Sequence, residues 1–127
     1  MVDQVAVLLP DESAGLEPER LEALYARLGP KEGEDVVCRA MEELAFRLGQ
    51  AQRFHDAGDD DGLIGCIRAL GAIADQIGMC ALRRVAEDVV QCARDGDPVA
   101  LAATLARLAR LGERSLYAIW DLQDVTV

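Results

Sequence analysis

Arg68 is the side chain of this sequence best suited to bind an anion, because it stands between two glycines, Gly65 and Gly71, on the outward face of an expected helix. Glycine inside a helix costs about 1 kcal/mol relative to alanine, and here it leaves a shallow surface from which only Arg68 projects. A guanidinium stays protonated and donates paired hydrogen bonds to carboxylates or phosphates, but it lacks the lone pair that a nucleophile needs. The pattern therefore predicts binding without nucleophilic chemistry.

We expect the helix face around Arg68 to contact a partner protein. It lies opposite the apolar stripe of the same helix and consists of Ile64, Gly65, Arg68, Gly71, Ala72 and Asp75. Small residues allow the backbone of a partner to approach closely. A second interpretation stays open, in which the glycines accommodate a neighbouring helix of the same chain.

The segment from Ala57 to Gly78 resembles the core of a histidine-containing phosphotransfer (HPt) domain. In that family a Gly-Asp turn starts a helix that carries the pattern His-x-Leu-Lys-Gly and ends with an apolar residue and a glycine. Here the turn Gly58-Asp59, the pattern's Leu70 and the closing Ile77-Gly78 all stand at the matching spacing. The resemblance is most specific in this segment and looser across the rest of residues 16–122.

Three positions of the segment depart from the family pattern. Arg68 replaces the histidine, Gly71 replaces the lysine and Ala72 replaces the glycine. In the family, a receiver domain docks on this face and its phosphoryl group passes to the exposed histidine, which must attack the phosphorus in line. The resemblance thus implies a non-catalytic, bacterial, HPt-like protein without a cofactor. It would bind the receiver domain of a response regulator or a histidine kinase and modulate two-component signalling.

Two other functions remain open at this point. His55 is the one histidine of the chain, and an active phosphotransfer protein would have to use it, although it lies outside the motif at the end of an expected helix. Lys31, the one lysine, lies in an expected loop and cannot replace the family's lysine near Arg68. The other alternative is a structural helical homodimer, with Gly65, Gly71 and Ala72 in a helix–helix seam.

The cysteines indicate neither a metal site nor a disulfide framework. Cys38, Cys66, Cys80 and Cys92 form no C-x-x-C pair, and their spacing to His55 matches no usual zinc set. We expect buried thiols, no bound metal and a reducing, cytoplasmic setting.

Length and charge suggest one acidic domain. The chain has 127 residues, a net charge of −10 and a pI of about 4.4. Such a charge repels nucleic acid and anionic membranes, so we expect neither as a partner. We also expect no signal peptide and no membrane span.

Apolar residues recur at helical spacing along most of the chain. The pattern predicts a helix up to Leu28, a second from near Glu34, a third over residues 60–77, a fourth from near Cys80 and a last from Pro98 to Trp120. Short loops favour antiparallel neighbours, which predicts an all-α, up-down four-helix bundle with an additional short N-terminal helix. The resemblance implies the same HPt-type layout.

Segments outside this bundle are expected to be irregular. Residues 1–15 form an N-terminal arm, in which Met1 to Leu9 has no helical stripe, and residues 16–122 form the bundle. Residues 123–127 form a tail, with a frayed or extended conformation expected from Asp121 onwards. Tyr117 and Trp120 are expected in the core or in a subunit interface.

Overall fold

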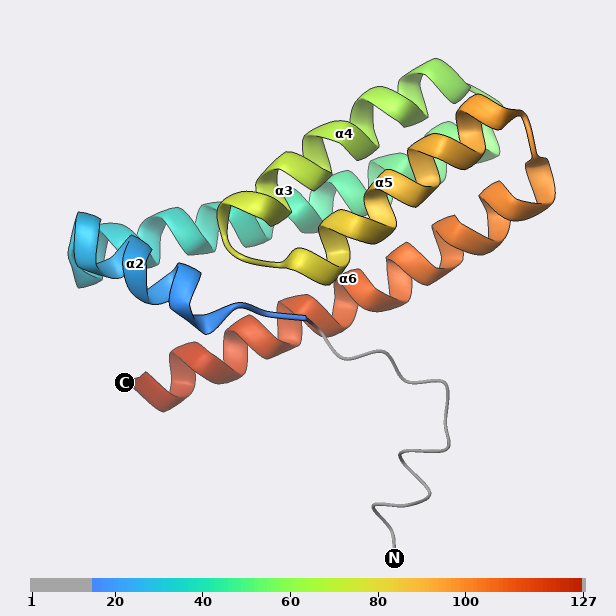
Figure 1. The fold of residues 1–127 in the computed structure, drawn as a ribbon. Coiled ribbons are helices and arrows are strands. Elements are labelled where there is room, and N and C mark those ends of the chain that lie inside the picture. The colour runs from blue at the N-terminus through green and yellow to red at the C-terminus, as the bar shows by residue number, and fades with distance from the viewer. Residues whose placement is uncertain (1–14, 127) are drawn as a thin grey trace, which may run out of the picture.

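The structure, a computed structural model, describes residues 15–126, and side chains for residues 15–121. This part of the chain folds into helices α2 Pro18–Leu28, α3 Pro30–Asp56, α4 Asp60–Gln76, α5 Cys80–Asp95 and α6 Pro98–Thr126 (Figure 1). Helices α3 to α6 contact each other in chain order, contacts between α3 and α6 close the ring, and α2 packs on α3. The expected all-α helical bundle is confirmed at this level. Of the arm expected at residues 1–15, residues 1–14 lie outside the described residues.

The core is built from the apolar stripes that the sequence predicts. In α4 and at its end, every residue of the expected stripe is buried, as are the expected residues of α5. These residues are Leu63, Cys66, Ile67, Leu70, Ala74, Ile77, Leu82, Val85, Ala86, Val89 and Ala93. No helix in the described part of the chain is long and apolar enough to cross a membrane.

Aspartate side chains cap the first turns of two of the helices. The side chain of Asp59 accepts a hydrogen bond from the backbone N–H of Gly62 (2.9 Å) at the start of α4. Asp97 accepts one from the N–H of Ala100 (3.1 Å) at the start of α6. Each bond satisfies an N–H that the first helical turn would leave unpaired. Both helices therefore begin at a position determined by local sequence.

Two expected helix boundaries are wrong. Helix α3 begins at Pro30, not near Glu34, because proline suits the first position of a helix, where no N–H partner exists. Gly29, with a φ of 88°, makes the turn before it. Helix α6 continues to Thr126, so residues 121–126 are helical and do not form the frayed or extended tail expected from Asp121.

The C-terminal aromatic residues are exposed, so the expectation that they belong to the core is wrong. Tyr117 is 67% exposed and Trp120 is 58% exposed. At 3.6 residues per turn, the buried Ser115 and Ile119 occupy the inward side of α6, and Tyr117, two positions from each, points outward. A subunit interface at these residues stays a prediction.

A short backbone pairing ties the start of the described chain to the turn between α4 and α5. The N–H of Glu17 donates to the carbonyl of Gly78 (2.9 Å), and the N–H and thiol of Cys80 both donate to the carbonyl of Gly15 (3.2 and 2.7 Å). Gly78 has a φ of 79°, and a Cβ built on it would lie 2.8 Å from the Cβ of Arg20. This turn therefore requires glycine both for its conformation and for the approach of α2.

The cysteines differ from one another in exposure. Cys66 is buried as expected, Cys80 and Cys92 are partly buried, and Cys38 is exposed, contrary to the expectation of buried thiols. The thiol of Cys66 donates to the backbone carbonyl of Arg47 (3.2 Å). Burial raises the pKa of the Cys66 thiol, and the nearby Arg47 guanidinium only partly offsets this effect. Cys66 should therefore behave as an inert core residue.

Two glycines of α4 provide a matched test of this packing. A Cβ at Gly62 would lie 2.6 Å from the Phe54 ring and from a carboxylate oxygen of Asp59, whereas a Cβ at Gly65 would meet open space. We expect Gly65→Ala to stabilise the fold by about 0.5–1 kcal/mol and Gly62→Ala to destabilise it by about 1–3 kcal/mol. Urea unfolding followed by circular dichroism measures both. A shift of both variants in the same direction would contradict the packing of α4 described above.

Alkylation should distinguish the buried thiol from the exposed one. Iodoacetamide at pH 8 should modify Cys38 readily, while Cys66 should react only when the chain unfolds, because the thiolate is the reactive form and burial disfavours it. Peptide mapping by mass spectrometry, with and without urea, measures the two rates. Equal rates in the native protein would show that Cys66 is not in the core.

Candidate functional site

A groove of about 490 Å³ runs along the surface between α4 and α5. The two helices are antiparallel neighbours joined by the tight turn at Ile77–Met79 (Figure 1). The groove is lined from both helices by Ile67, Arg68, Gly71, Ala72, Asp75, Arg83, Ala86, Glu87, Val90, Gln91 and Arg94. It is the place where most of the expected partner-binding residues meet.

Arg68 is exposed at the side of this groove, as expected. Its guanidinium makes no hydrogen bond or ion pair with any other residue that the structure describes. The groove floor beside it is made of small residues, and a Cβ at Gly71 would lie 3.6 Å from the Cβ of Ala86, an ordinary contact distance. Glycine at position 71 is therefore not required for the packing of α4 on α5. The shallow floor leaves room for a partner.

Asp75 lines the groove at the end near the α4–α5 turn, but its charge is already compensated. One of its carboxylate oxygens lies 3.4 Å from Nε of Arg83 and 3.8 Å from Nη1 of Arg20. Arg20 also donates to the backbone carbonyl of Asp75. Arg83 in turn pairs with Glu87 at 2.7 Å. Asp75 thus links α2, α4 and α5, and we assign it a structural role beside any contact with a partner.

Two of the expected partner-binding residues do not line the groove. Ile64 is partly buried and packs against the core, since it follows the core residue Leu63 by one position. Gly65 is exposed, with open space where a side chain would stand. The groove lining therefore includes Arg68, Gly71, Ala72 and Asp75, whereas Ile64 and Gly65, which precede Arg68 by one helical turn, lie outside it.

Helix α5 supplies half of the groove, and the sequence interpretation missed this half. Arg83, Glu87 and Arg94 are the charged residues that it contributes. Residues at equal separations from the turn face one another in an antiparallel pair, as Gly71 faces Ala86 and Asp75 faces Arg83. Because the turn at Ile77–Met79 is short, its position in the sequence predicts which residues of α5 face those of α4.

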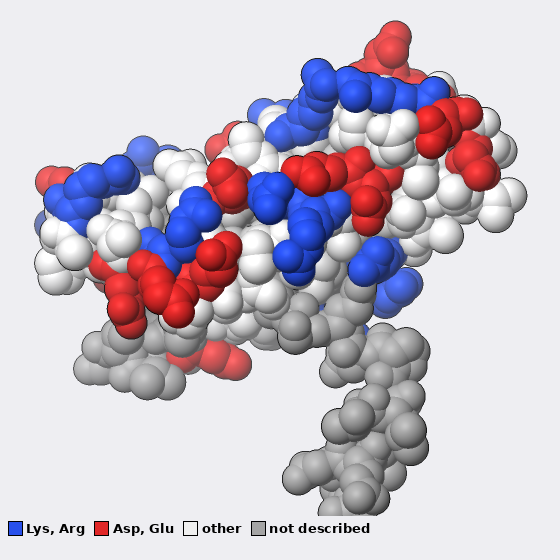
Figure 2. Space-filling view, in the orientation of Figure 1, with Lys and Arg blue, Asp and Glu red and all other residues white. Residues whose placement is uncertain are grey.

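Charge is distributed unevenly along the face that carries the groove. Figure 2 shows a row of basic side chains along the upper edge of this face, with acidic side chains directly above and beside its right-hand end, and mixed acidic and basic side chains over the rest of the face. The mixed region agrees with the ion pairs of Asp75 and Glu87. Among the residues that line the groove, Arg68 and Arg94 are the charged ones at the end away from the α4–α5 turn, although the whole chain is acidic.

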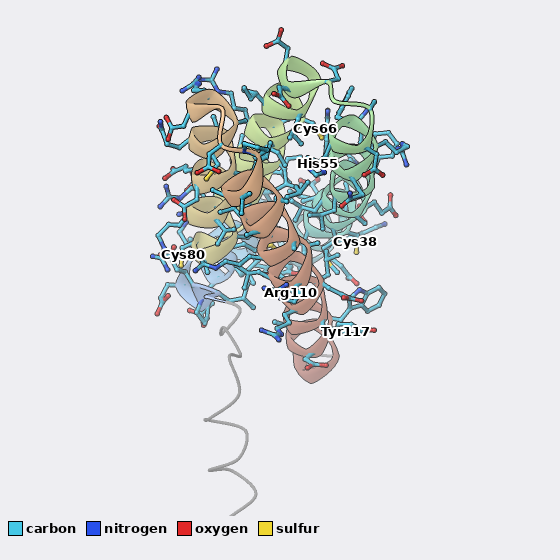
Figure 3. The ribbon with its side chains drawn as sticks, turned by 90° about the vertical axis from the view of Figure 1, so that its right-hand side faces the viewer. Cys38, His55, Cys66, Cys80, Arg110 and Tyr117 are labelled. Carbon is cyan, nitrogen blue, oxygen red and sulfur yellow. The ribbon has the colours of Figure 1, made fainter. Side chains whose placement is uncertain are left out.

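His55 does not line this groove. It lies in the last turn of α3, at the same end of the bundle as Cys66 in Figure 3, and it is partly buried. Its Nδ1 is buried and has no hydrogen-bond partner among the described residues. In that part of the chain, no group of three or more His, Cys, Asp or Glu side chains is arranged to hold a metal ion.

Comparison of the chain with protein-family models, with curated proteins and with solved structures gave no match. The inference of function therefore depends on the residues of the groove and on the resemblance of the segment around Arg68 to an HPt domain.

Proposed function

We propose that this chain is a non-catalytic HPt-like protein that binds a receiver domain or a histidine kinase through the groove between α4 and α5. The observation that carries the proposal is Arg68, an exposed cation that is unpaired within residues 15–121 and stands at the position where the family pattern has its histidine. By occupying the docking surface of its partner, the chain modulates two-component signalling without carrying the phosphoryl group.

The arrangement of the helices supports an HPt-type bundle. Four consecutive helices pack as an antiparallel ring, and a short helix, α2, precedes them. The motif position, Arg68, lies in the middle of α4 and faces solvent, where a partner domain has access to it. A fold of this type presents the docking residues on two rigid helices, which favours a defined orientation of the bound partner.

The chemistry of the groove supports binding without phosphoryl transfer. None of the residues that line it is a histidine or a cysteine, and Arg68 stays protonated at neutral pH. A guanidinium pairs well with the carboxylates of an acidic active site, because its donors match two oxygens at once. The small residues Gly71 and Ala72 in the lining of the groove allow a partner to approach closely.

Substitution of Arg68 should weaken docking. Titration calorimetry against a panel of receiver domains and kinase domains should find a partner whose affinity falls about tenfold or more with Arg68→Gln, because a charged hydrogen bond contributes roughly 1.5–3 kcal/mol. Gly71→Glu should weaken it similarly by placing a carboxylate in the groove, while Gly71→Ala should not. Arg84→Gln is the matched control, since Arg84 is exposed on α5 but does not line the groove.

Normal binding by both Arg68→Gln and Gly71→Glu would remove the groove as the docking surface. Light scattering on the same variants tests the alternative of self-association. If the wild-type chain forms a dimer and Gly71→Glu dissociates it, the groove binds a second copy of the chain and not a signalling partner.

The chain should not become phosphorylated by a partner. Incubation with a phosphorylated receiver domain should leave no acid-labile label on it, because His55, its one histidine, lies away from the groove and is partly buried. Radiolabel counting before and after acid treatment measures this. An acid-labile label that is lost in His55→Gln would show that the chain is an active phosphotransfer protein.

A further inference from the structure

Arg94 is a second cation in the groove, contributed by the last turn of α5. Like Arg68, it is exposed, and it makes no hydrogen bond or ion pair with another described residue. The antiparallel register that sets Asp75 opposite Arg83 and Gly71 opposite Ala86 puts both arginines on the side away from the α4–α5 turn. The two unpaired guanidinium groups therefore belong to one end of the groove.

The carboxylates of the groove do not balance these two cations. Asp75 is paired with Arg20 and Arg83, and Glu87 is paired with Arg83 at 2.7 Å, all towards the turn. Gln91, the remaining polar residue of the lining, donates its amide N–H to Asp95 (2.8 Å). The end of the groove at Arg68 and Arg94 thus carries two positive charges without a paired carboxylate among its lining residues.

We propose that Arg68 and Arg94 together bind a phosphoryl group displayed by the docked protein partner. A phosphoryl group carries a charge of about −1.5 to −2 and three acceptor oxygens, so it can pair with both guanidinium groups at once. A single carboxylate carries one negative charge and leaves the second arginine uncompensated. The inference deepens the proposed function and rests on it for the identity of the carrier. The phosphoryl group is bound and stays on the partner.

The anion site is tested on the full-length chain alone, with inorganic phosphate as the probe. NMR titration at constant ionic strength should give saturable shifts at the Nε–H signals of Arg68 and Arg94. Sulfate should bind with a similar affinity. Acetate should bind more weakly than phosphate by about tenfold or more, because it carries a single charge. Arg68→Gln and Arg94→Gln should each weaken phosphate binding about tenfold or more, and Arg84→Gln should leave it unchanged.

A phosphate titration that does not saturate, or that Arg94→Gln leaves unaltered, overturns the inference. So does acetate binding as tight as that of phosphate, because it would assign the site to carboxylates. A partner that docks equally on the wild-type chain and on Arg94→Gln, whether phosphorylated or not, overturns it while leaving the proposed docking intact. Saturable phosphate binding with no docking partner supports the anion site and counts against the proposed function.

Discussion

The close approach of α4 to α5 determines where every residue of the candidate site lies. The turn that joins the two helices is short, so they pack side by side, and Gly71 faces Ala86 across their contact. In an antiparallel pair joined by a tight turn, register follows directly from sequence separation. Hence the same turn that closes α4 also decides that Asp75 meets Arg83 and that Arg68 and Arg94 share one end of the groove.

The features that could be predicted from the sequence are those that depend on local chemistry. The buried stripe of α4 follows from its period, and the starts of α4 and α6 follow from the caps Asp59 and Asp97. The exposure of Arg68 follows from the same period. The predicted orientation was wrong for a residue at the border between the buried and the exposed face of a helix. Ile64, predicted on the outward face of α4, lies at the border of the buried face, where it is partly buried and packs against the core.

Other features depend on residues far apart in the sequence, and the sequence pattern does not reveal them. The ion pair of Asp75 with Arg20 joins residues 55 positions apart, and it requires α2 to lie against the α4–α5 turn. Nothing in the spacing of charges along the chain predicts this. Arg94 was missed for a related reason, because a groove has two walls and the pattern around Arg68 describes only one. Tyr117 and Trp120 are large and apolar, but their phase on α6 sets them outward.

The ion pairs near the α4–α5 turn and the unpaired arginines at the other end serve different purposes within one groove. The ion pairs of Arg20, Asp75 and Arg83 connect three helices and stabilise the fold. Their contribution to the free energy of unfolding is modest, because the pairs are exposed. Arg68 and Arg94 have no such partner among the residues that the structure describes, so their charge is available to a ligand. Fields from the rest of the acidic surface are screened beyond about 8 Å at physiological ionic strength. A bound anionic group therefore interacts with the charges close to it, which are these two cations and nearby carboxylates such as Asp95, and much less with the rest of the net charge of −10.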